Sequence, residues 1–263
     1  MSSYLYMIKV KLLLAFNYRA EFFIGMISKM VLLSATAFFW KAAYKGIDVQ
    51  GAVNERQMLI YSVISIIMSQ IFSISVEDNI RSRVRMGNVA VDFIKPVNVF
   101  LMYFSEDIGN AVTSIVQKVV PIIIFSVLFI VTPVPYSILH FMLFAVSAII
   151  SYMILWFSNA IFGLFYFWAI DMGPLGTIKD YLILILSGSF VPIWFFPQSV
   201  QAVLKCLPFI YMYQHPISIY IGKVSYSEAA GGIFIQIVWT VIFALIFNHI
   251  KKRVERNVLV QGG

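Results

Sequence analysis

Residues 77–98 of the chain read EDNIRSRVRMGNVAVDFIKPVN and form its longest polar interruption. The rest of the sequence is almost entirely apolar. This stretch holds four of the 19 Lys and Arg residues and three of the 12 Asp and Glu residues. We therefore interpret it as the part of the chain that is best suited to contact a water-soluble partner.

The composition of the chain is that of a polytopic membrane protein. It has 61% hydrophobic and 12% charged residues and a mean hydropathy of +0.89, whereas soluble domains contain about 25% charged residues. The formal net charge of +7 fits basic loops that face anionic lipid, so it does not predict nucleic-acid binding. We expect residues 1–263 to form a single all-α transmembrane domain in the lipid bilayer.

Six apolar runs are predicted to cross the membrane, which takes about 20 residues for roughly 30 Å of hydrocarbon. Residues 1–20 mix apolar and basic side chains and are predicted to form a helix along the membrane interface. Of the Lys and Arg residues, 12 lie on one predicted side, 5 on the other and 2 within spans, which places both termini in the cytoplasm. The predicted spans are Phe22–Trp40, Met58–Val76, Ile108–Val131, Ile138–Ile170, Tyr181–Phe196 and Ile233–Ile250.

Two lysines, Lys29 and Lys118, fall inside predicted spans. A lysine at mid-span costs at least about 2.5–3.5 kcal/mol on insertion scales and is a functional candidate. Lys29 can also be read as a side chain that extends towards the inner interface. Lys118 lies three residues before Pro121, whose missing N–H loosens the helix, and for this lysine packing and function both remain open.

The outer segment, residues 186–223, is apolar and aromatic but contains four prolines that forbid one continuous helix. Broken backbone at membrane depth survives only where protein or a water-lined cavity covers it. We therefore predict short helices that enter the outer leaflet and turn back, with an ordinary apolar loop as the alternative.

Residues for catalysis are missing from the sequence. It has no G-x-x-x-x-G-K-[ST] phosphate loop, no H-E-x-x-H motif, only one cysteine, and three histidines that lie far apart. We therefore predict no catalytic residue, no metal and no cofactor bound by this chain, and a role in transport rather than an enzymatic one.

The order and spacing of two motifs resemble those of ABC-2 type permeases. They are similar to the I-R-x-G-x-x-D-x-x-L-x-K-P inner loop and the P…F-P…L-P-F…P…G outer motif of exporter permeases of this length. Ala90 stands where the family has an aspartate, and Asp92 follows two residues later. The matching residues are Val84-Arg85-Met86-Gly87-Asn88-Val89 and Phe93-Ile94-Lys95-Pro96 in the inner loop, and Gly188, Pro192, Phe196-Pro197, Leu207-Pro208-Phe209, Pro216 and Gly222 in the outer segment.

The resemblance implies a type V exporter permease with six spans, an interfacial N-terminal helix, a cytoplasmic coupling helix and re-entrant outer helices. A separate cytosolic ABC ATPase would hold ATP and Mg²⁺, and a second permease, either another copy or a similar chain, would complete the pair. The implied function is export of a lipophilic or amphipathic substrate, such as a drug, peptide or lipid, across the cell (plasma or inner) membrane of a bacterium. The implied residues are Arg81, Arg85, Gly87, Asp92, Phe93, Lys95 and Pro96 for coupling to the ATPase, and Pro192, Phe196, Pro197, Pro208, Phe209, Pro216 and Gly222 for an outer gate.

The inner stretch is compatible with this role. Residues 77–85 can form a helix with Arg81 and Arg85 on one face, and Gly87 can end it in a left-handed conformation. We expect the apolar side of this short helix to fill a cleft on the ATPase. Two alternatives stay open: an ion-driven secondary transporter or channel, and a membrane protein that binds partners but transports nothing.

Overall fold

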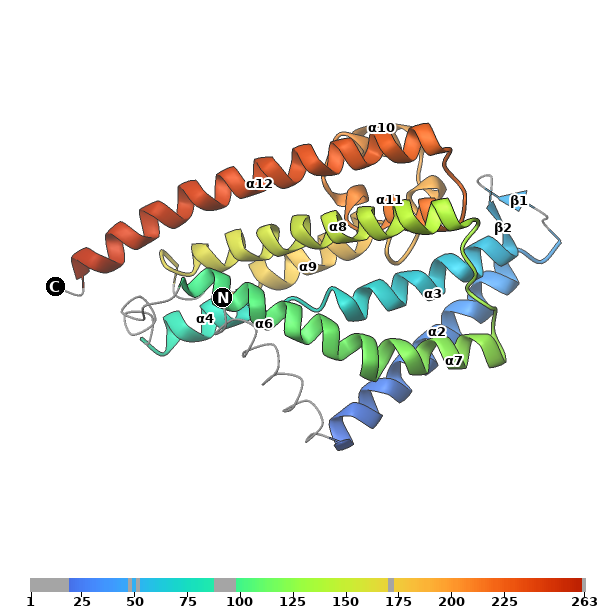
Figure 1. Ribbon diagram of the computed structural model, residues 1–263, viewed down its shortest axis with the longest axis horizontal. Coiled ribbons are helices and arrows are strands. Elements are labelled where there is room, and N and C mark those ends of the chain that lie inside the picture. Colours follow the sequence, from blue (N-terminus) through green and yellow to red (C-terminus); the bar gives the residue numbers. More distant parts are fainter. Residues whose placement is uncertain (1–18, 47–48, 51–52, 88–97, 170–172, 262–263) are drawn as a thin grey trace.

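The computed structural model describes residues 19–46, 49–50, 53–87, 98–169 and 173–261, and its described part is almost entirely helical (Figure 1). In chain order the elements are α2 (Arg19–Ala43), β1 (Val49–Gln50), β2 (Val53–Asn54), α3 (Glu55–Ile71), α4 (Val76–Arg85), α6 (Val99–Ser114), the π-helical turn η1 (Ile115–Val119), α7 (Val120–Phe129), α8 (Ile138–Phe165), α9 (Leu175–Leu186), the 3₁₀ turn η2 (Ile193–Phe195), α10 (Gln198–Lys205), the 3₁₀ turn η3 (Phe209–Tyr211), α11 (Gln214–Tyr220) and α12 (Tyr226–Gln261).

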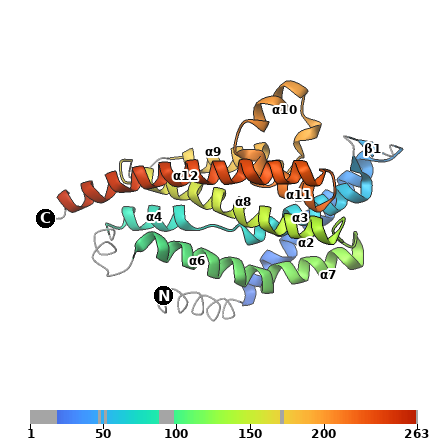
Figure 2. The same cartoon turned by 45° about the horizontal axis from the view of Figure 1, so that its top comes forward.

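The long helices run roughly along the long axis of the molecule, and α2 is inclined to them (Figure 1). The short antiparallel pair β1–β2 lies at one end, and α12 extends past the other helices at the opposite end. Figure 2 shows that α10 projects from the body of the bundle. The buried side chains form two hydrophobic clusters, one among α2, α3 and the outer segment and one among α4, α6, α8 and α12.

The helix α3 begins at a capping box that the sequence provides. The Asn54 side chain accepts a hydrogen bond from the backbone N–H of Gln57 at 2.8 Å, and the Gln57 side chain accepts one from the backbone N–H of Asn54 at 3.0 Å. The Gln57 amide also donates to the carbonyl of Ile221 at 3.0 Å. This start of α3 is therefore tied to the end of the outer segment.

The all-α membrane fold is confirmed, with corrections to the helix bounds. Five helical segments among the described residues are long and apolar enough to cross a membrane. The second predicted span is broken between α3 and α4, and the third begins at Val99 because the Asn98 side chain caps α6 by accepting from two backbone N–H groups at 3.1 Å. The fourth ends at Phe165 rather than Ile170, and the last extends over Tyr226–Gln261.

The predicted span Tyr181–Phe196 is wrong as a single helix. The helix α9 ends at Leu186, and Gly188 has a φ of +76°. With 12 residues, α9 is about 18 Å long, which is short of the roughly 30 Å of a hydrocarbon core. The helix also begins earlier than predicted, at Leu175 instead of Tyr181. The charge of Lys179 suggested a loop at this point, but the Lys179 side chain is buried within the protein.

Candidate functional site

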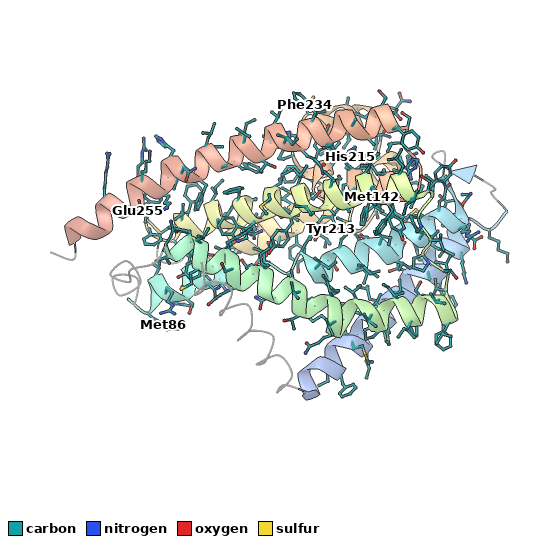
Figure 3. The ribbon with its side chains drawn as sticks, viewed as in Figure 1. Met86, Met142, Tyr213, His215, Phe234 and Glu255 are labelled. Carbon is teal, nitrogen blue, oxygen red and sulfur yellow. The ribbon has the colours of Figure 1, made fainter. Side chains whose placement is uncertain are left out.

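The helix that the sequence predicts over residues 77–85 is present as α4, and its coupling role stays a prediction. It ends as predicted, because Gly87 has a φ of +71°, a conformation that glycine adopts without strain. Met86, which follows the helix, lies at the same end of the molecule as Glu255 of α12 (Figure 3). The predicted contact residues Asp92, Phe93, Lys95 and Pro96 lie outside the described residues, and their roles stay predictions.

A buried ion pair joins α4 to α9. Glu77 and Lys179 are only 8% and 6% exposed, and the Lys179 ammonium donates to the Glu77 carboxylate. The same ammonium donates to the Asn159 side chain of α8 at 2.5 Å and lies 3.1 Å from the exposed carboxylate of Asp180. Buried charges are stable only when they are paired and hydrogen-bonded in this way. The pair therefore connects the polar stretch 77–98 to the segment between the predicted spans Ile138–Ile170 and Tyr181–Phe196.

Two glycines make room for this pair. A Cβ atom on Gly163 of α8 would lie 2.7 Å from the Ile80 side chain and 3.3 Å from the Cα of Glu77. A Cβ atom on Gly176 of α9 would lie 2.8 Å from the Glu77 carboxylate. The backbone of α4 can approach both helices because neither position carries a side chain.

A second buried carboxylate, Asp107 of α6, holds the start of α4. It accepts hydrogen bonds from the backbone N–H and the hydroxyl of Ser75 at 2.8 and 2.5 Å, and from the indole N–H of Trp156 at 3.1 Å. Ser75 is the residue before α4, where a negative charge is favourable because of the helix dipole. The break between α3 and α4 is thus fixed by a side chain that lies 32 residues away in sequence.

The packing of α4 corrects one expectation. Its apolar residues Val76 and Ile80 are 0% and 3% exposed and belong to the cluster with α6 and α8. The apolar side of this helix is therefore buried within the chain itself and does not fill a cleft on a partner. Its exposed side carries Arg81 and Arg85, and Arg81 forms a 2.7 Å ion pair with the exposed carboxylate of Asp78.

The outer segment consists of short helices, as its prolines predict. Gln214 holds it together, because its backbone N–H donates to the carbonyl of Ser187 at 3.0 Å and its side chain accepts from the backbone N–H of Ile193 at 2.5 Å. Of the predicted gate residues, Pro192, Pro197 and Pro208 directly precede η2, α10 and η3, Phe196 follows η2, Phe209 opens η3, Pro216 lies in the first turn of α11, and Gly222 follows α11 with a φ of +71° against the ring of Tyr136.

Neutral groups connect this segment to the long helices. The Tyr61 hydroxyl of α3 donates to the carbonyl of Gly188 at 2.7 Å. The fully buried amide of Gln236 in α12 donates to the carbonyl of Tyr211 at 2.8 Å and to the Ser151 hydroxyl at 2.9 Å, and it accepts from the Ser147 hydroxyl at 2.9 Å. These bonds position the outer segment without any buried charge pair among the residues that the structure describes.

Two ionisable groups of the outer segment respond to burial. Burial lowers the pKa of His215 to about 4, so its ring is neutral at physiological pH. Burial also lowers the pKa of Lys223, and the charge of Glu228 opposes this shift. The Lys223 ammonium lies 4.6 Å from the centre of the Trp194 ring, a cation–π contact.

The two intramembrane lysines occupy different surroundings. Lys118 lies in the π-helical turn η1 ahead of Pro121, which confirms the predicted loosening of that helix. π-helical turns of this kind are frequent at functional sites. Lys29 of α2 lines a groove of mixed polar and apolar residues that also involves α3 and the end of α9. Both lysines are partly buried, and no ion pair joins either of them to another described residue.

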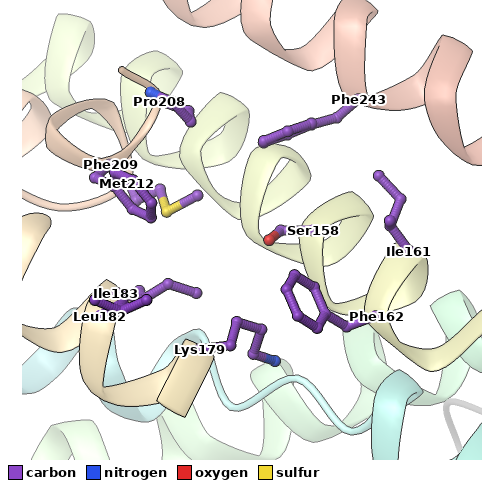
Figure 4. A pocket seen from close by; sticks show the side chains of 10 residues that line it. All are labelled: Ser158, Ile161, Phe162, Lys179, Leu182, Ile183, Pro208, Phe209, Met212 and Phe243. Atoms are coloured by element: carbon purple, nitrogen blue, oxygen red, sulfur yellow. The ribbon is translucent and has the colours of Figure 1, made fainter. Parts of the chain in front are cut away.

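An apolar pocket of about 190 Å³ lies between α8, α9, η3 and α12 (Figure 4). Phe162, Met212 and Phe243 contribute side chains from three different parts of the chain, and Lys179 lies beside Phe162 with its ammonium 5.3 Å from the ring centre. The pocket therefore borders the buried ion pair on one side and the outer segment on the other.

Sequence reasoning missed three of these residues, namely Lys179, Asp107 and Gln236. Lys179 falls between the predicted spans Ile138–Ile170 and Tyr181–Phe196, Asp107 directly precedes the span predicted from Ile108, and no role was predicted for Gln236. The available signal was a charged or amide side chain next to or within an apolar run, which predicts a buried polar partner.

The comparisons with known proteins agree with this architecture. The family model described as ABC-2 family transporter protein matches residues 30–257. No curated protein and no solved structure matches the chain. The matched range includes the five long apolar segments almost completely. The chain therefore belongs to the ABC-2 transporter family and is the membrane permease component of an ABC transporter, a component that works with an ABC ATPase.

Proposed function

We propose that this permease exports a lipophilic or amphipathic substrate from the cell, using ATP hydrolysis by a separate cytosolic ATPase that docks at α4 and the loop following it. It would act as a pair with a second copy or a similar permease, with both termini in the cytoplasm. The 12-to-5 asymmetry of Lys and Arg residues supports this orientation. The family relationship supports the ATPase partner.

The observation that carries the proposal is the buried ion pair between Glu77 and Lys179. Because the apolar side of α4 is packed against α6 and α8, α4 cannot shift without moving its neighbours. Through its ion pair with Glu77, Lys179 also connects α4 to α9, the helix that leads directly into the outer segment. A push on the exposed arginine side of α4 would therefore reach the outer segment through α9. This is the route that an alternating-access transporter needs.

The test uses two glycines with the same backbone conformation. Gly87 ends α4 with a φ of +71°, and Gly46 follows α2 with a φ of +80°; a Cβ atom would meet nothing within 4 Å at either position. Proline cannot adopt a positive φ, so Gly87→Pro and Gly46→Pro both distort a turn. We expect Gly87→Pro to abolish co-purification of the ATPase and stimulated transport while membrane insertion stays normal.

Gly46→Pro is the matched control and should retain both activities. Phe93→Ala should behave like Gly87→Pro if Phe93 anchors the ATPase. Full ATPase binding and transport in both Gly87→Pro and Phe93→Ala would contradict the proposal and leave this stretch as a determinant of topology only.

A further inference from the structure

The groove beside Lys29 is lined by both polar and apolar residues of the apolar helical bundle. It has a volume of about 210 Å³ and lies between α2, α3 and the turn after α9. Lys29 lies 10 residues after the first and 14 before the last residue of α2, which is about 15 Å and about 21 Å along the helix axis. The apolar part of this helix runs over Phe23–Ala43, so Lys29 lies six residues, about 9 Å, from its nearer end.

The walls of the groove combine polar and apolar groups. Its polar side chains are those of Lys29, Thr36, Tyr61, Ser62, Ser65, Ser69 and Ser189. Leu32, Ile66, Leu184 and Phe190 complete the lining. An occupant that suits both kinds of surface has a polar group attached to an apolar body.

The hydroxyl groups of the groove are already satisfied within the protein. Ser65 donates to the carbonyl of Ser189 at 2.6 Å, Tyr61 to that of Gly188 at 2.7 Å, and Ser189 to that of Leu184 at 3.0 Å. Ser62, Ser69 and Thr36 donate to carbonyls of their own helices. All of these hydroxyl protons are therefore used within the protein. Each hydroxyl oxygen keeps at least one lone pair that can accept a hydrogen bond, and that of Ser69 already accepts from the Gln70 amide at 3.1 Å.

Lys29 is the exception in the groove. Its ammonium brings three donors and a positive charge, and no hydrogen bond or ion pair joins it to another described residue. By contrast, the buried Lys179 has three oxygen partners. Lys179 is thus paired completely, whereas Lys29, like Lys118, has no such partner among the described residues, and Lys29 in addition lines a groove. An unpaired lysine within an apolar span is a functional candidate.

We propose that this groove binds the anionic headgroup, a carboxylate or phosphate, of the amphipathic molecule that the permease transports. The anion would pair with Lys29, hydroxyl or amino groups of the headgroup would donate to the serine oxygens, and the apolar body would lie against Leu32 and Phe190. This inference deepens the proposed function and rests on it.

Binding is tested on the permease alone, in nanodiscs of zwitterionic phosphatidylcholine. The probes are a long-chain alkyl carboxylate and an alkyl phosphate, each with a photoreactive diazirine in the chain, and the matching neutral methyl ester. Labelled peptides are mapped by mass spectrometry. We expect the anionic probes to label peptides of α2, α3 and residues 184–190, and the ester to label them at least tenfold less.

Three variants make the test specific. Lys29→Met should reduce labelling by the anionic probes at least tenfold, and Lys29→Arg should restore most of it because the positive charge returns. Lys41→Met removes an exposed lysine from the end of the same helix and should leave labelling unchanged. Equal labelling of wild type and Lys29→Met, or equal labelling by ester and anion, would overturn the inference.

A second readout separates this inference from the proposed function. With the partner ATPase bound, the anionic amphiphile should stimulate ATP hydrolysis in wild type and in Lys41→Met but not in Lys29→Met, and Lys41→Met should also keep the basal hydrolysis of wild type. Labelling at Lys29 without stimulation would overturn the assignment to a substrate. If wild-type permease bound no ATPase, the proposed function would fail although the labelling result would still report on the groove.

Discussion

The two ends of this permease are held together by different chemistry. We call the end with α4, which we propose faces the cytoplasm, the inner end or half, and the end with the outer segment the outer end or half. At the inner end, α4 is fixed by two buried carboxylates, Glu77 and Asp107, and the first of these is paired with a buried lysine. At the outer end, the short helices are fixed by amide and hydroxyl groups that bond to backbone carbonyls, and by aromatic contacts such as the stacked rings of Trp40 and Phe195 at 5.2 Å.

This difference has a mechanical consequence. Truncating one partner of a buried ion pair strands a charge and costs about 3–5 kcal/mol, whereas loss of a neutral hydrogen bond leaves a penalty of about 1–3 kcal/mol. The inner end should therefore move as one unit with α8 and α9. The outer segment, whose contacts are individually weaker and more numerous, can rearrange in smaller steps.

Removing the charge of Lys179 gives the largest expected effect. Lys179→Met strands the Glu77 carboxylate and should lower the free energy of unfolding by about 3–5 kcal/mol, measured by thermal unfolding of the purified permease in nonionic detergent. The double variant Glu77→Gln with Lys179→Met should recover more than half of this loss. Arg81→Met removes one partner of an ion pair whose side chains are 49% and 69% exposed, so it should cost about 1 kcal/mol or less. Equal losses for Lys179→Met and Arg81→Met would remove the distinction between the two halves.

The outer half is tested at Gln236. Gln236→Leu removes the partner of the Ser147 hydroxyl and two donors to buried oxygens, which should cost about 2 kcal/mol, within the range for unsatisfied buried groups. Gln201→Leu in α10 is the control, since Gln201 is only partly buried and its main hydrogen bond is to the carbonyl of Phe196. A loss for Gln236→Leu as large as that for Lys179→Met would show that neutral groups hold the outer half as firmly as charges hold the inner half.

Close packing at the inner end is tested by adding one methyl group. Gly163→Ala places a Cβ atom too close to Ile80 and Glu77 and should cost about 1–3 kcal/mol through overpacking. Gly25→Ala lies in α2, where a Cβ atom would meet nothing within 4 Å, so it should leave stability unchanged or slightly higher. The thermal unfolding midpoints of the two variants, compared with that of wild type, measure these changes in stability. A neutral Gly163→Ala would mean that α4 can move away from α8 at little cost.

The smallest effect on stability is expected at Lys118. Lys118→Met should change the free energy of unfolding by less than about 1 kcal/mol, because Lys118 has no ion pair among the described residues and sits in an already loosened π-helical turn. If Lys118 faces the transport pathway, transport per molecule will fall while membrane abundance stays the same. Unchanged transport with equal or greater abundance would mark this lysine as a tolerated residue.

The sequence by itself determined that this is a membrane protein, where most of its long helices lie, and the helix ends that depend on local chemistry. Apolar runs of membrane length predicted five of the helical segments, and Gly87 predicted the end of α4. The prolines of the outer segment predicted its division into short helices, since a missing N–H and a fixed φ act on the local chain alone. The order of two loop motifs was enough to identify the family that the matched residues 30–257 confirm.

Only the tertiary structure decided which polar groups are buried and with what partner. The break before α4 has neither glycine nor proline and depends on Asp107, and the pairing of Glu77 with Lys179 joins residues 102 positions apart. The interrupted span after α9 likewise depends on Tyr61 and Gln214, which supply the bonds that a continued helix would have made. A hydropathy pattern sums contributions along the chain, whereas burial of a charge depends on what lies across from it in space.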